Sequence, residues 1–84
     1  MPYQVEVAEP LLRPLASQVR TRVWLALARV AQVVDRMPAQ RLRDVEAVAL
    51  GEGYSASYRV DIGTRTVSLL GIEHRAEAQS QPHT

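Results

Sequence analysis

The chain has 84 residues, a formal net charge of +1 and no cysteine. This length suits one small domain, which buries only about 60–65% of the surface that its unfolded form exposes. The absence of cysteine excludes a disulfide framework and a cysteine-based zinc site. All ten basic residues are arginines. We attribute that bias to GC-rich coding, although any single arginine remains able to bind a phosphate through planar, bidentate contacts.

The N-terminal residues MPYQVEVAEP contain neither the basic region nor the long apolar run of a signal peptide. The longest uncharged run of the helical part, VWLALA, is far shorter than the roughly 18 residues that a membrane span needs. We therefore expect a cytoplasmic protein without a membrane contact.

The first predicted element is a strand. Residues 2–8 alternate between apolar and polar side chains, which predicts a half-buried strand with Tyr3, Val5 and Val7 on one side. Residues 10–16 then predict a short helix, because Pro10 suits a first helical position.

A long helix is predicted from Gln18 to Asp35, with Ser17 as its N-cap and Met37-Pro38 ending it. Its apolar residues recur at spacings of three and four, as a core-facing stripe requires. This stripe comprises Val19, Val23, Leu27, Val30 and Val34, widened by Trp24, Ala26 and Ala31. The opposite face carries Arg22, Arg29 and Arg36, which we interpret as solvated side chains. Residues 38–43 predict a loop.

Strands are predicted over residues 44–50, 54–62 and 66–74, with turns at residues 51–53 and 63–65. The 54–62 segment alternates, so one face should pack under the helices and the other should point outward. The helix side would hold Tyr54, Ala56, Tyr58, Val60 and Ile62, and the outer side Ser55, Ser57, Arg59 and Asp61. The last segment has Val67 and Leu69 on one face and Leu70 and Ile72 on the other, which predicts a central strand.

These elements predict an α+β fold with the order β-α-α-β-β-β. A helical hairpin would pack on one face of a mostly antiparallel four-stranded sheet. We expect residues 1–75 to form a single domain and residues 76–84 to form a disordered tail, because the tail has no apolar residue larger than Ala.

The chemistry-bearing residues concentrate on the outer sheet face. No phosphate-binding loop, zinc motif or nucleophile motif occurs, and two histidines, His74 and His83, are too few for a structural zinc site. Arg59 and Arg75 would suit an anionic ligand such as an RNA backbone. The alternative is an ordinary solvated face, where Arg59 meets a cross-strand acid for less than about 1 kcal/mol. Spacing alone favours this alternative.

Residues 53–78, GYSASYRVDIGTRTVSLLGIEHRAEA, resemble the end of RelE/ParE-superfamily toxins from bacterial toxin–antitoxin modules. The segments YQVEV and LASQVRTRVWLALARVAQVVDRMP resemble the first strand and the helical hairpin of the same family. The resemblance implies a toxin that enters the ribosomal A site and cleaves mRNA or, in the ParE branch, one that poisons gyrase. The RelE branch is the closer match.

The resemblance also implies catalytic roles for individual residues and binding partners for the protein. Arg75 would bind the scissile phosphate, Arg59 would support it, and His74 would serve as acid or base. We expect further RNA contacts from Arg41, Arg43, Ser55 and Ser57. A cognate antitoxin, wrapped over the toxin, and the ribosome with its mRNA are the expected partners. No cofactor or metal is expected, and homodimer formation stays open.

Several positions depart from the RelE pattern. Ser55 stands where the nucleases have an arginine, Gln79 stands where they have a tyrosine, and the second strand carries Glu46 in place of lysines. Such a set also suits a non-catalytic, protein-binding member of the fold or a ParE-like gyrase inhibitor. A third alternative is an unrelated α+β module, which requires that Val5 does not pair within the sheet of residues 44–74.

Overall fold

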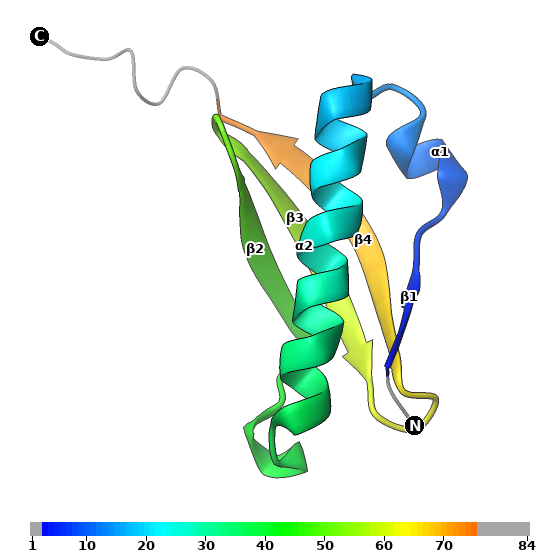
Figure 1. Cartoon of the computed structure of the whole chain (residues 1–84), viewed down its shortest axis with the longest axis vertical. Helices are drawn as coiled ribbons and strands as arrows, with labels where there is room; N and C mark the ends of the chain where they lie inside the picture. Colours follow the sequence, from blue (N-terminus) through cyan, green and yellow to red (C-terminus); the bar gives the residue numbers. More distant parts are fainter. Residues whose placement is uncertain (1–2, 76–84) are drawn as a thin grey trace, which may run out of the picture.

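The computed structural model describes residues 3–75, so the predicted tail over 76–84, with Gln79 and His83, lies outside the described residues. The elements, in chain order, are β1 (Gln4–Glu6), α1 (Glu9–Leu12), α2 (Ser17–Arg36), the 3₁₀ turn η1 (Ala39–Arg41), β2 (Val45–Gly51), β3 (Tyr54–Asp61) and β4 (Thr66–His74). Figure 1 shows α2 crossing one face of the sheet, with β2 and β1 on its two sides. Among the described residues, no helix is both long and apolar enough to cross a membrane.

The sheet has the strand order β1-β4-β3-β2, so the prediction that β4 is central is confirmed. The two hairpins make β2, β3 and β4 an antiparallel meander, and β1 joins β4 in parallel. Val5 lies opposite Val67 in that pairing, which removes the alternative of an unrelated module. The predicted α+β class and mostly antiparallel sheet are confirmed.

Both predicted helices are present, but the predicted extent of the short one, residues 10–16, is wrong. The short helix α1 ends at Leu12, two residues before Pro14, which has no N–H group to continue it. The prediction that Ser17 caps α2 is also wrong, because Ala16 is the last extended residue (φ −64°, ψ 153°) and Ser17 is already helical. The Ser17 carbonyl instead accepts a hydrogen bond from the Thr21 hydroxyl at 3.0 Å.

The core lies between α2 and the sheet, where Val23, Leu27 and Val67 are fully buried. Two predicted core positions are wrong. Trp24 is 45% exposed, because it is turned about 100° around the helix from Val23 and lies beside the apolar stripe. Ile62 is 47% exposed, because β3 ends one residue before it.

A β-bulge in β4 overturns the predicted faces of that strand. Ser57 lies opposite Gly71 and Tyr58 opposite Leu69, so Leu70 is an extra residue without a partner. A one-residue insertion moves every later side chain to the other face. Ile72 therefore packs against the core opposite Ala56, while Leu70 is 43% exposed. The bulge decides which side chains at the end of β4 reach the outer face.

Candidate functional site

The candidate site lies at one end of the outer face of the sheet. The β2–β3 turn and the end of β4 form this end. Glu73 lies opposite Ser55, and both belong to the outer face. Strand alternation gives Arg75 the same side as Glu73. The Arg75 N–H donates a hydrogen bond of 2.9 Å to the Gly53 carbonyl, which fixes the Arg75 backbone beside the turn.

Gly53 permits this close approach for two reasons. Its φ of +83° lies in the left-handed region, which favours glycine. A Cβ at Gly53 would also stand 3.2 Å from the Arg75 carbonyl oxygen and 3.4 Å from the His74 ring. A side chain here would therefore push Arg75 away from the turn.

His74 lies on the other side of the sheet from this site. It is opposite Tyr54, a residue of the helix side, and the two rings stack with centroids 3.9 Å apart. A general acid or base must approach the proton it transfers within about 2.6–3.2 Å, or through one water. The structure thus separates His74 from Arg75, its expected partner on the outer face.

Arg59 is also distant from Arg75. It lies opposite Ser68, six residues along β3 from Gly53, which corresponds to about 20 Å of strand. Its Nε stands 3.7 Å from the Asp44 carboxylate, and both side chains are more than half exposed. Such an exposed ion pair contributes little to stability. It agrees with the alternative that the outer face around Arg59 is an ordinary solvated face.

The expected RNA contacts fall into two groups. Ser55 and Ser57 share the half-buried outer face near Glu73 and Gly71. Arg41 and Arg43 lie at the other end, around η1 and the start of β2. There Arg43 and Arg59 line a shallow depression of about 390 Å³. Arg43 is held by Glu46 at 3.4 Å. No single cluster contains all seven predicted residues.

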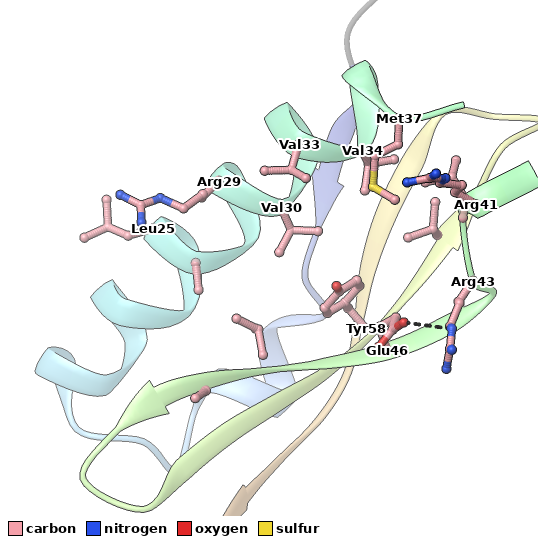
Figure 2. Close-up of a pocket in the computed structure, with 15 residues that line it drawn as sticks. Leu25, Arg29, Val30, Val33, Val34, Met37, Arg41, Arg43, Glu46 and Tyr58 are labelled. Carbon is pink, nitrogen blue, oxygen red and sulfur yellow. Dashed lines mark ion pairs between the residues drawn. The ribbon is translucent and has the colours of Figure 1, made fainter. Parts of the chain in front are cut away.

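A groove of about 540 Å³ between α2 and β2 had not been predicted. Figure 2 shows α2 along one side of the groove and β2 along the other. Leu25 and Val33 on its helix side are 66% and 51% exposed. The spacing of four in Leu25, Arg29, Val33 and Met37 is the sequence signal for this wall. Arg29 on this wall is exposed, as expected for a solvated side chain, and it also lines the groove.

Tyr58 is the titratable group that this groove perturbs. Burial raises the pKa of the Tyr58 phenol above its usual range, and the nearby Glu46 carboxylate adds to the increase. Both residues line the groove, as Figure 2 shows. The phenol thus stays neutral well into alkaline solution. Within residues 3–75, no group of three or more histidine or carboxylate side chains is placed to hold a metal ion.

Solved structures that match this fold include RelE toxins. A mutant of the E. coli toxin RelE in the free state, with two arginines replaced by alanine, is 28% identical. The match covers 94% of this chain and 88% of that chain, with a TM-score of 0.66. The chain has the RelE toxin fold. This confirms the resemblance to the RelE branch.

Two structures of the RelE fold contain an antitoxin. The same E. coli RelE mutant in complex with an antitoxin RelBc peptide is 26% identical over 95% of this chain and 93% of that chain (TM-score 0.65). The toxin–antitoxin complex RelBE2 from Mycobacterium tuberculosis matches at 25% identity over 90% of this chain and 94% of that chain (TM-score 0.50). No protein-family model matches the sequence, and no curated protein matches it.

Proposed function

We propose that the chain is the toxin of a bacterial toxin–antitoxin module, which inhibits translation by cleaving mRNA at the ribosome and is neutralised by an antitoxin. The observation that carries this proposal is the open outer end of the sheet, where Arg75 is fixed to Gly53 beside Glu73 and Ser55. The likeness to RelE over 94% of the chain supports it.

Cleavage of RNA by its own 2′-hydroxyl requires a base for that hydroxyl, stabilisation of the phosphate charge and a proton for the leaving oxygen. The Arg75 guanidinium binds the scissile phosphate through two parallel hydrogen bonds. Glu73, on the same face, accepts the hydroxyl proton in place of His74. Solvent supplies the proton to the leaving oxygen, because both side chains are exposed.

The remaining arginines act on other phosphates of the same RNA. Arg59 lies about 20 Å along the strand from the Arg75 end, which is too far for the scissile group. Together with Arg41 and Arg43 it binds the backbone some nucleotides away. Ser55 and Ser57 line the face between the two ends and donate hydroxyl hydrogen bonds.

Expression in bacterial cells tests this proposal. The wild-type chain arrests growth, and Arg75→Ala and Glu73→Gln each relieve the arrest. Arg20→Ala is the matched control, because Arg20 is exposed on α2 outside the sheet, and it leaves the arrest unchanged. Wild-type growth equal to that of an empty vector would refute the toxin assignment.

A second candidate function is protein binding without catalysis, and one observation favours it. The strand β2 contributes only apolar side chains, Val45, Ala47 and Ala49, to the outer face opposite Arg59, Ser57 and Ser55. Ribosomes programmed with mRNA distinguish the two functions. Cuts in the message within the A-site codon, absent with Arg75→Ala, exclude pure binding, whereas an intact message with growth arrest supports it.

A further inference from the structure

The strand β2 is an open edge of the sheet. The strand order β1-β4-β3-β2 gives it β3 as its one neighbour among residues 3–75. It runs over seven residues, Val45–Gly51, and contains neither the proline nor the lysine that commonly protects such an edge. The opposite edge, β1, has only three residues. Within the described part of the chain, β2 is therefore the edge that offers the longer template for a further strand.

Alternate backbone groups of β2 point to this open edge. The Val60 N–H donates a hydrogen bond of 2.9 Å to the Asp44 carbonyl, and the same register continues along β2 as far as Ala49. In an antiparallel pair, residues that bond to the neighbouring strand alternate with residues whose backbone groups point away from it. The N–H and C=O groups of Val45, Ala47 and Ala49 therefore point to the edge, and all three residues are exposed.

This edge is complementary to itself. Two copies of β2 pair antiparallel around a two-fold axis at Ala47, which places Ala47 opposite Ala47 of the second copy. Val45 then lies opposite Ala49 of the second copy, and each of the three residues donates and accepts a hydrogen bond across the joint. Their side chains belong to the outer face and are small and apolar, so no like charges meet there.

The single charge on β2 favours a second copy as the partner. Glu46 lines the groove on the helix side, and an inward-pointing charge at an edge normally opposes strand addition. In the symmetric pair, Glu46 of the second copy lies opposite Val48, and Val48 lines the same groove as Arg29. Arg29 forms no ion pair among residues 3–75. A second copy thus brings a carboxylate towards Arg29 and an arginine towards Glu46.

We propose that the chain forms a symmetric homodimer through β2, which joins two four-stranded sheets into one. The two-fold axis is perpendicular to the joined sheet, so both α2 helices cover the same face. Val33, which is 51% exposed on α2, adds apolar surface on each side of the axis. The inference is independent of the proposed function, because β3 separates β2 from β4, the strand that leads to Arg75.

Sedimentation velocity of the full chain tests the proposal. The wild type should show a reversible monomer–dimer equilibrium at concentrations of about 1–200 μM, and a monomer throughout this range would overturn the proposal. Ala47→Glu places like charges opposite each other at the axis and should weaken the dimer at least about tenfold. Ala28→Glu, the same change at an exposed position on α2 away from β2, is the matched control and should dimerise like the wild type.

A charge exchange locates the axis. Ala47→Lys should also be monomeric by itself, whereas an equimolar mixture with Ala47→Glu should form a dimer with one copy of each variant. Only an axis at Ala47 places the two substituted positions opposite each other. A mixture that stays monomeric, or a dimer that persists in each variant alone, would refute the β2 interface.

Two further variants separate the backbone ladder from the ion pair. Ala47→Pro removes an N–H group that β3 does not use, so the monomer keeps its fold by circular dichroism and loses the dimer. Ala47→Val retains this N–H and should remain dimeric. Arg29→Gln should weaken the dimer about tenfold in the wild type and have little effect in Glu46→Gln. Equal dimerisation of the proline and valine variants would overturn the strand pairing, and an unchanged dimer in Arg29→Gln would overturn the ion pair.

Discussion

The imidazole ring of His74 lies flat against the phenol ring of Tyr54, with centroids 3.9 Å apart and planes within 8° of parallel. The two residues are opposite each other in β4 and β3, on the side that α2 covers. The stack gives this histidine a packing role at the end of β4. It leaves the outer face to Glu73 and Arg75.

The stack predicts that an aromatic ring suffices at position 74. His74→Phe keeps the stability of the wild type, whereas His74→Ala lowers the free energy of unfolding by about 0.5–1.5 kcal/mol. Urea unfolding followed by circular dichroism measures both. Glu73→Ala, one position away on the outer face, serves as the control with little change. Growth arrest that survives in Tyr54→Leu and disappears in His74→Phe would contradict a packing role.

Gly53 should be the least replaceable glycine among the described residues. Gly53→Ala costs about 1–3 kcal/mol of stability, because φ is +83° and the new Cβ meets the Arg75 carbonyl oxygen at 3.2 Å. Gly71→Ala is the matched control, since a Cβ there meets no atom within 4 Å. Thermal unfolding of the two variants makes the comparison. A larger loss in Gly71→Ala would show that the turn is not held as described.

Tyr58 should titrate abnormally at alkaline pH. Its raised pKa means that the folded state favours the neutral phenol. The associated stability is fully present below the ordinary value of 10.0 and is lost as the pH rises through the folded value. Glu46→Gln moves the pKa of Tyr58 downward, and burial, the larger cause, keeps it above the ordinary value. Ultraviolet titration of tyrosinate, with Tyr58→Phe to assign the signal, measures the shift.

Arg43 provides the control for this titration. Removing its charge leaves the Glu46 carboxylate in place, so Arg43→Gln does not lower the pKa of Tyr58. A lower pKa in Arg43→Gln, or an unchanged one in Glu46→Gln, would show that the carboxylate does not act on the phenol.

Truncation of two leucines on α2 should lower the stability of the protein to very different degrees. Leu27 is fully buried, so Leu27→Ala lowers the free energy of unfolding by about 2–5 kcal/mol. Leu25 is 66% exposed in the groove wall, so Leu25→Ala changes it by at most about 0.5 kcal/mol. Chemical denaturation gives both values. A comparable loss at the two positions would mean that the groove is closed in solution.

The fold was largely predictable because its signals are local. The spacing of Val19, Val23 and Leu27 predicts the buried side of α2, and the alternation from Tyr54 to Val60 predicts the two faces of β3. The paired glycines 51 and 53 predict the turn between β2 and β3.

The candidate site was less predictable, because it depends on register. The bulge at Leu70 arises from the pairing of β4 with β3, and the residues LLGI carry no periodic sign of it. Simple alternation from Val67 therefore predicts the wrong face for Ile72. The distance between Arg59 and Arg75 follows from the same pairing. The groove could not be predicted, because exposed residues on one side of α2 indicate by themselves only a solvated face.

The parallel pairing of β1 with β4 has a consequence for how the protein is made. Among residues 3–75, the sole strand neighbour of β1 in the sheet is a segment about 60 residues further along the chain. A nascent chain therefore holds its first strand without a partner until the last strand has been synthesised. The entropy of closing such a long loop is lost before the contact stabilises the chain, so we expect the β3–β4 hairpin to form early and β1 to dock late. A truncated translation product that lacks β4 cannot assemble the sheet or present Arg75.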